Sequence, residues 1–378
     1  MNNSWDRLGI RNEIWRLVKK HNLGMFAPRR LGKTYLMQNY LRIEAESQGW
    51  RAVYCDLQGA ETCQEAVVEI VNEINRQSQL SETFTAHFKA KFRQLTTGGN
   101  ADFQHVLQQT DWQTLLDAVL EGIENQNANT LLMLDEVTVC VNRILSRDPQ
   151  QGRQFLDILR KYRFKYNQHI RWLLTGSIGL NHLAERHQLT GQLNDLQPVL
   201  LTPLTPAQAR DFTAYFCQSE DVAQPFQLGA ASHRHLQQRL GWLSPYYIEK
   251  LCLRIQPPSP PSDGLASANK PHIDKACDEL LTHPYTEAFK AWPDHLQRNI
   301  EPVLRDVCHA VLRFLCTRRD GESFDVIRTA LAPEFTEQQA KVALALLVDD
   351  GFLSQQRAKG RYTYQMSLLA DYWAEYHH

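Results

Sequence analysis

Gly32, Lys33 and Thr34 are consecutive residues whose types and order suit phosphate chemistry. The glycine lets the backbone approach a phosphate, the lysine supplies a positive charge for the β- and γ-phosphates, and the threonine hydroxyl can ligate Mg²⁺. The octet Ala-Pro-Arg-Arg-Leu-Gly-Lys-Thr fits the phosphate-binding pattern G-x-x-x-x-G-K-[ST], except that Ala27 replaces the first glycine. We predict that the loop and the next residue bind nucleotide phosphates: Ala27, Pro28, Arg29, Arg30, Leu31, Gly32, Lys33, Thr34 and Tyr35.

Two carboxylates, Asp135 and Glu136, end the apolar run that starts at Leu131. We expect Asp135 to hold Mg²⁺ through water, together with Thr34, and Glu136 to act as the general base that polarises the attacking water. The alternative is that Asp-Glu at the end of a strand only caps the following helix. Because the pair accompanies a phosphate-binding loop earlier in the chain, we favour the catalytic interpretation.

Thr175 and Ser177 end another apolar run, Trp-Leu-Leu-Thr-Gly-Ser. Hydroxyls at this strand end would lie within reach of a γ-phosphate or its attacking water, so we predict that both are catalytic, as are Lys33 and Glu136. The alternative is a hydroxyl-rich turn between a strand and a helix, and the sequence favours neither interpretation.

These residues need elements to position them, and apolar stretches typical of buried strands are separated by segments with helical periodicity. The predicted strands span residues 23–26, 51–57, 131–137, 170–177 and 199–204. A helix is predicted directly after the loop, with its free N–H groups aimed at the phosphates. Strands that alternate with helices indicate a parallel sheet, which binds ligands at the carboxyl ends of its strands.

The composition is that of a globular protein of 378 residues, with 43% hydrophobic and 22% charged residues. This length allows two or three domains. A net charge of −1 gives no general attraction to nucleic acid or to an anionic membrane. No apolar run reaches the roughly 18 residues of a membrane span, and the first residues show no signal pattern. Because the cysteines are scattered without a C-x-x-C pair, we expect reduced, buried thiols and a cytoplasmic location.

The pattern changes after residue 204. Short helices without strands are predicted up to residue 255, followed by a proline-rich linker or exposed loop. Three helices and then a β-hairpin are predicted beyond it: 302–317, 324–331 and 337–348, then 352–356 and 362–366 with a turn at 359–361. This order of elements is typical of a winged helix.

Together, these motifs resemble the archaeal-type P-loop ATPases of prokaryotes, relatives of the AAA+ and STAND ATPases. The resemblance rests on Pro-Arg-Arg-x-Gly-Lys-Thr, Leu-Asp-Glu and Leu-Thr-Gly-Ser-Ile-Gly-Leu. It extends to Gly-Ile-Arg-Asn-Glu at 9–13, Gly-Trp-Leu-Ser-Pro at 241–245 and the pair Tyr372-Trp373. The family pattern has a glycine where Ala27 stands, and alanine is tolerated there unless the backbone needs a positive φ.

The resemblance implies an α/β fold, with a parallel P-loop NTPase sheet of the AAA+ kind, a helical lid and a C-terminal winged-helix domain. The implied boundaries are a P-loop ATPase core at 1–204, a lid at 205–255, a linker or loop at 256–272 and a helical and winged-helix domain at 273–378. The resemblance also implies particular residues: Thr175 or Ser177 as a sensor, Pro245 close to the adenine, and Lys250 or Arg254 as a sensor on the lid.

Local charge bears on the choice of partner. From residue 301 onward, nine Lys or Arg residues stand against eleven Asp or Glu residues, a net charge of −2. The helix predicted from Glu337 carries only Lys341 as a basic residue, and the basic cluster of this region is on the predicted hairpin: Arg357, Lys359 and Arg361. Because DNA phosphates are bound by basic side chains, a protein partner or a structural role is favoured over DNA binding.

Residues 143–171 form the basic segment of the chain, with eight Lys or Arg against two Asp. One interpretation is a solvated helix face. The other is a surface that meets a polyanion or the nucleotide of a neighbouring subunit, where an arginine would stabilise transition-state charge. The candidates for that arginine are Arg160, Arg163 and Arg186.

We therefore expect the protein to bind ATP and Mg²⁺ and to hydrolyse ATP as a switch that controls contacts with a protein partner or a second copy. The alternative is a regulator that binds ATP without hydrolysing it, or that binds DNA through the winged helix. A phosphoryl-transfer kinase is less favoured, because no acceptor pocket can be recognised.

Overall fold

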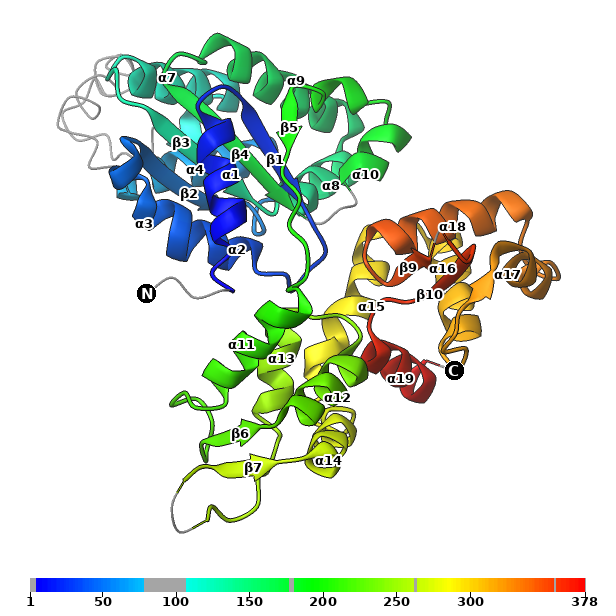
Figure 1. The fold of residues 1–378 in the computed structure, drawn as a ribbon. Helices are drawn as coiled ribbons and strands as arrows, with labels where there is room; N and C mark the ends of the chain where they lie inside the picture. Colours follow the sequence, from blue (N-terminus) through cyan, green and yellow to red (C-terminus); the bar gives the residue numbers. More distant parts are fainter. Residues whose placement is uncertain (1–4, 78–106, 177–179, 262–263, 357, 378) are drawn as a thin grey trace. The chain divides into compact units, whose positions relative to one another are not determined.

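A computed structural model describes residues 5–77, 107–176, 180–261, 264–356 and 358–377 (Figure 1). The chain divides into two compact units. The sheet unit comprises Gly9–Ala27 and Lys33–Leu201, and the helical unit comprises Met1–Leu8, Pro28–Gly32 and Thr202–His378. Among the described residues, no helix has the length and apolar character needed to cross a membrane.

A parallel sheet of five strands forms the centre of the sheet unit in the described part of the chain, in the order β2-β3-β4-β1-β5. The strands are β1 (Asn22–Phe26), β2 (Arg51–Asp56), β3 (Thr130–Asp135), β4 (Ile170–Gly176) and β5 (Leu196–Pro198). The fully buried pattern of β3 is the pattern expected of a strand covered on both faces. The predicted parallel sheet is therefore confirmed.

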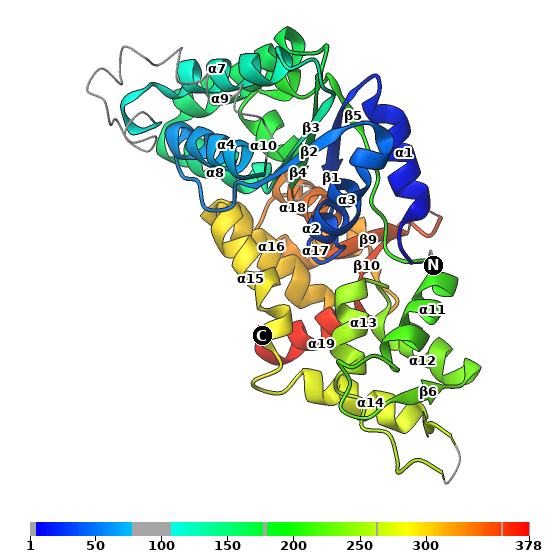
Figure 2. The ribbon, with the colours of Figure 1, turned by 90° about the vertical axis from the view of Figure 1, so that its left-hand side faces the viewer.

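Helices cover both faces of this sheet (Figure 2). One face packs Leu132, Leu134 and Trp172 into a single core with the helices α4, α7, α8, α9 and α10. These helices are α4 (Cys63–Gln77), α7 (Trp112–Glu124), α8 (Val137–Arg147), α9 (Pro149–Lys165) and α10 (Leu180–Arg186). The opposite face lies toward α1 (Leu8–Val18) and the helical run α2 (Lys33–Leu36), η1 (Met37–Leu41) and α3 (Arg42–Glu44).

The predicted fifth strand is wrong in position. Residues 199–204 are not a strand, and β5 lies just before them at Leu196–Pro198. The ladder beside β1 continues only as far as the bond from the amide of Val199 to the carbonyl of Gly24, 2.8 Å long. Proline at 198 and 203 lacks the N–H that would extend the ladder.

The first part of the helical unit contains α11 (Pro206–Phe216), α12 (Ala230–Leu240), α13 (Pro245–Cys252), α14 (Lys270–Leu280) and α15 (Glu287–Asn299), together with two short strands. These strands, β6 (Phe226–Leu228) and β7 (Ala266–Ala268), pair in parallel. The strand β6 contradicts the prediction of helices alone up to residue 255, and β7 lies within the stretch predicted as a linker or loop. Three residues per strand are too few for a period-two pattern to be recognised in a sequence.

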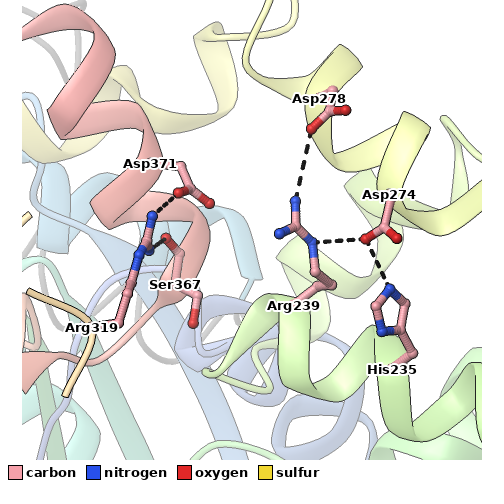
Figure 3. Close-up of polar contacts among 7 residues, drawn as sticks. All are labelled: His235, Arg239, Asp274, Asp278, Arg319, Ser367 and Asp371. Atoms are coloured by element: carbon pink, nitrogen blue, oxygen red, sulfur yellow. Dashed lines mark hydrogen bonds and ion pairs between the residues drawn. The ribbon is translucent and has the colours of Figure 1, made fainter. Parts of the chain in front are cut away.

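Ion pairs join the helices of this unit (Figure 3). Asp274 on α14 lies 2.8 Å from His235 and 3.1 Å from Arg239, both on α12. At the other cluster in Figure 3, Arg319 pairs with Asp371 and donates to the carbonyl of Ser367. These contacts hold α12 against α14, and the segment around Arg319 against the last helix.

The C-terminal part contains α16 (Pro302–Leu315), α17 (Phe324–Leu331), α18 (Glu337–Asp349) and α19 (Ser367–Tyr376). The hairpin strands β9 (Leu353–Gln356) and β10 (Arg361–Tyr364) pair antiparallel, and β8 (Glu322–Ser323) adds to the edge of β10. The predicted helices and hairpin are confirmed as elements, whereas the prediction from sequence did not include β8. All eight cysteines are buried thiols.

Candidate functional site

The carboxylate of Asp135 is the centre of the candidate site. Asp135 ends β3 and is only 1% exposed. Among the described residues, four groups donate hydrogen bonds to it. The hydroxyl of Thr34 lies 2.6 Å and that of Tyr54 3.3 Å from Oδ2, while the hydroxyl of Thr175 and the amide of Glu136 donate to Oδ1. The fold therefore brings together four of the predicted residues, Asp135 included, and one residue that was not predicted.

Thr175 is fully buried in β4, which lies next to β3 in the sheet. Its hydroxyl is bonded to Asp135, so in this conformation it positions the carboxylate. Ser177, predicted with it, lies outside the described residues.

The phosphate-binding loop has the backbone that its sequence requires. Gly32 has φ +91°, a left-handed conformation that glycine adopts without steric cost. Ala27 is not among the described residues with positive φ, and its amide donates to the carbonyl of Gly176 over 3.2 Å. Because position 27 does not need a positive φ, alanine is compatible with the turn. The ammonium of Lys33 lies 2.6 Å from the carbonyl of Ala27.

Glu136 has a strained backbone and an unused side-chain oxygen. Its φ of 53° is left-handed, an uncommon conformation for a residue with a side chain. Its side chain makes no capping bond to α8, and Oε2 is buried without a hydrogen-bond partner among the described residues. Simple helix capping therefore does not explain this residue, and strain of this kind is frequent at functional sites.

Tyr54 and Asp56 are residues of the same sheet edge that the sequence interpretation missed. Both lie on β2, where Asp56 pairs with Asp135 in the strand register. Desolvation raises the pKa of the Asp56 carboxyl, the amide of Gln58 lowers it, and the charge of Asp135 raises it again. Burial and the same carboxylates raise the pKa of the Tyr54 phenol, so it remains a hydrogen-bond donor at neutral pH. The signal in the sequence was a polar residue at the end of a predicted strand.

The middle of the loop, Pro28–Gly32, belongs to the helical unit. The hydroxyl of the buried Ser244 donates to the carbonyl of Arg30, and the guanidinium of Arg30 lies 4.2 Å from the centre of the Tyr246 ring. Arg30 has φ +67°. A Cβ on Gly351 would come within 2.7 Å of the Pro28 ring, so the turn at Gly351 packs closely on the loop. We call these contacts the loop clasp.

The residues predicted near the adenine or as lid sensors lie on or just after α13. Pro245 is the first residue of α13 and is half-buried beside Ser244. Lys250 lies 5.3 Å from the ring of Tyr246, whereas Arg254 lies over Tyr285 and 3.8 Å from Glu279. Of the two predicted lid sensors, Lys250 is the one that lies near the Tyr246 ring, which Arg30 of the loop also contacts.

The remaining loop residues differ in exposure. Leu31 is buried, Arg29 is half-buried, and Tyr35 is 60% exposed.

The basic segment is largely engaged within its own unit. Arg147 pairs with Glu61, and Lys165 lies 2.7 Å from Asp117. The prediction that Arg163 could reach another subunit is wrong, because its side chain is fully buried and bonded to Asp195. Arg160 is half-buried near Phe164. The side chain of Arg186, the third candidate, lies outside the described residues.

The sequence matches no protein-family model. It also matches no curated protein. Solved structures are similar over nearly the whole chain. The Walker-type ATPase PABY2304 of Pyrococcus abyssi is 15% identical with a TM-score of 0.67, covering 97% of this chain and 95% of that one. The ORC2 protein of Aeropyrum pernix, solved as ADPNP–ADP complexes, is 13% identical with a TM-score of 0.56, covering 98% and 92%. The chain therefore has the fold of archaeal P-loop ATPases of the AAA+ kind, as the motifs predicted.

Proposed function

We propose that this protein binds ATP with Mg²⁺, hydrolyses it, and uses the nucleotide state as a switch for contacts with other macromolecules. The observation that carries the proposal is the convergence of Thr34 and Thr175 on Asp135, next to Glu136, whose Oε2 has no hydrogen-bond partner among the described residues. The likeness to a Walker-type ATPase supports it at the level of the fold.

The donor set fits a magnesium nucleotide. Mg²⁺ prefers oxygen ligands and usually keeps several waters. Thr34 offers a hydroxyl and Asp135 a carboxylate, and the two groups are hydrogen-bonded to each other. When bound, the ion would neutralise charge on the β- and γ-phosphates. Lys33 would hold the same phosphates through its ammonium group, and Gly32 would let the backbone approach them.

Glu136 is the residue that we propose as general base. A water oxygen forms a bond to the γ-phosphorus, the bond from that phosphorus to the bridging oxygen breaks, and the proton of the water passes to the Glu136 carboxylate. The products are ADP and inorganic phosphate. Among the described residues Oε2 has no hydrogen-bond partner, which supports this role, because an oxygen already bonded to a neighbour would be a weaker acceptor.

A phosphate-release assay tests hydrolysis directly. We expect the purified protein to release phosphate from ATP when Mg²⁺ is present, and to stop when EDTA removes the ion, because the ion that Thr34 and Asp135 would hold would neutralise phosphate charge. Absent phosphate release, or release that continues in EDTA, contradicts the proposal.

The loop clasp supports the switch. Ser244 donates to the carbonyl of Arg30, and the ring of Tyr246 contacts the Arg30 guanidinium, within a loop whose backbone N–H groups are suited to phosphates. A nucleotide that reorganises this loop therefore changes the contacts of the turn before α13 and of Gly351. We propose that this is how the nucleotide state reaches the helical unit.

Replacing Tyr246 by alanine is expected to weaken that transmission. A cation–π contact contributes roughly 0.5–2 kcal/mol, so its loss loosens Arg30 from α13. In hydrogen exchange of the full chain, Mg-ATP is expected to change exchange across α13, and in Tyr246→Ala this change is expected to fall to roughly half or less. Tyr285→Ala is the matched control, because it removes the Arg254 contact of the same kind in the same unit. Equal responses in the two variants would contradict the switch.

We propose the partner to be a protein or a second copy of the chain, and the region 273–378 to be a helical and winged-helix domain beyond a lid at 205–255 and a linker at 256–272. The recognition position on α18 offers little for DNA, since its Lys341 lies 2.6 Å from Glu337. On the hairpin, Arg361 donates to the carbonyl of Gly321, and Arg357 lies outside the described residues. Light scattering with and without ATP distinguishes self-association from a separate partner.

A further inference from the structure

Tyr54 donates a hydrogen bond to Asp135, the carboxylate at the centre of the candidate site, although no sequence motif includes Tyr54. Its side chain is buried, at 8% exposure, on the strand that neighbours β3. Its hydroxyl lies 3.3 Å from Oδ2 of Asp135, the same oxygen to which Thr34 donates. Tyr54 and Thr34 therefore act on one oxygen from two different elements, β2 and α2.

Gln38 links the Tyr54 hydroxyl to the helical run after the loop. The side chain of Gln38 is close enough to this hydroxyl to lower the pKa of Tyr54, against the larger effect of burial. Gln38 follows Thr34 by about one helical turn, and it lies in the π-helical segment Met37–Leu41. Such segments are rare and are frequently found at functional sites. Gln38 therefore lies beside the hydroxyl that donates to Asp135.

Packing alone does not account for a tyrosine at this position. A phenylalanine would fill the same space, and a buried hydroxyl is tolerated only where it finds a partner. Here that partner is the carboxylate proposed to hold the metal ion. Tyr162 in the same unit differs, since its hydroxyl bonds to the backbone carbonyl of Gln113 over 3.1 Å.

We propose that Tyr54 is a positioning residue for Asp135, and that its hydroxyl, oriented by Gln38, holds Oδ2 in the direction required by the Mg²⁺ of bound ATP. The inference rests on the proposed function. Without this donor the carboxylate turns more freely about its Cβ–Cγ bond, so it would hold the metal ion less firmly. Loss of groups that orient metal ligands commonly lowers metal affinity by about 10- to 100-fold.

The test is the affinity of Tyr54→Phe for Mn²⁺, measured by electron paramagnetic resonance with a non-hydrolysable ATP analogue bound. We expect the dissociation constant for Mn²⁺ to rise about tenfold, while the affinity for the analogue in EDTA stays unchanged. In a phosphate-release assay, saturating Mg²⁺ is expected to restore kcat to within about twofold of the parent, since the base is intact.

Two further variants separate positioning from a general effect on structure. Tyr162→Phe also removes a buried hydroxyl of the sheet unit, and it is expected to leave Mn²⁺ affinity unchanged. Gln38→Leu changes an exposed position, so it tests whether Gln38 orients the Tyr54 hydroxyl even if Tyr54→Phe folds poorly. We expect a smaller rise in the Mn²⁺ dissociation constant, about two- to fivefold, because Tyr54 keeps its donor.

Each outcome has one meaning. If the parent binds Mn²⁺ with the analogue and both Tyr54→Phe and Gln38→Leu bind Mn²⁺ equally well, the positioning role is wrong and the ATPase proposal stands. An equal loss in Tyr162→Phe also overturns the positioning role. If the parent itself binds neither the analogue nor Mn²⁺, the proposed function and this inference both fail.

Discussion

Replacing Lys33 by alanine is expected to weaken ATP binding by at least about 100-fold, which corresponds to about 3 kcal/mol. Lys33 supplies the point charge of the loop for the phosphates, and no other loop residue replaces an ammonium group at that position. Fluorescence anisotropy of a labelled ATP analogue, titrated in Mg²⁺, measures the change. Because the ammonium of Lys33 donates to the carbonyl of Ala27 within the same loop, the thermal midpoint is expected to shift by only a few degrees.

Lys161→Ala is the control for this experiment. Lys161 is exposed on α9, and its ammonium lies 5.9 Å from the ring of Tyr162. It carries the same charge in the same unit, so its removal tests whether general electrostatics explain the loss. If Lys33→Ala binds ATP as well as the parent, the ATPase and the non-hydrolysing ATP-binding regulator are both wrong.

Replacing Glu136 by glutamine is expected to separate binding from hydrolysis. The two side chains are similar in size, so ATP affinity should stay within about threefold, whereas loss of a general base lowers the rate by roughly 10²- to 10⁴-fold. Phosphate release at saturating Mg-ATP gives the rate, and anisotropy of the labelled analogue gives the affinity. The prediction depends on the position of Glu136, whose buried Oε2 has no hydrogen-bond partner among the described residues.

Glu46→Gln makes the same chemical change at an exposed position of the sheet unit, and its rate is expected to equal that of the parent. A Glu136→Gln variant with the parent's rate would leave the protein an ATPase with a different base. Asp56 would then be the next carboxylate to replace, because it pairs with Asp135 in the strand register.

The sequence determined the phosphate-binding loop, the two adjacent carboxylates and the parallel sheet. Each of these is written in contiguous residues: Gly32-Lys33-Thr34 is read directly, and the apolar runs of β1 to β4 are long enough to show their character. The same reasoning fails for elements of three residues or fewer. Strands β5, β6 and β8 were misplaced or missed, because hydrogen bonding to a neighbour creates them and no periodic pattern does.

The tertiary structure alone decided which side chains meet. Tyr54 reaches Asp135 because β2 and β3 are neighbours in the sheet, although 81 positions separate the two residues. The contact of Ser244 with Arg30 spans 214 positions and lies within the helical unit, to which Pro28–Gly32 belongs. Arg163 shows the converse, since a basic residue that suited an interface is buried against Asp195.

The backbone conformation of Ala27 is another feature that only the tertiary structure decides. The sequence shows an alanine where a glycine is usual, but only the folded backbone shows that this position keeps a φ outside the left-handed region. Local chemistry is therefore fixed by residue type and order. Which side chains from distant parts of the sequence meet, and whether φ at a given position is positive, depend on long-range contacts within the folded unit.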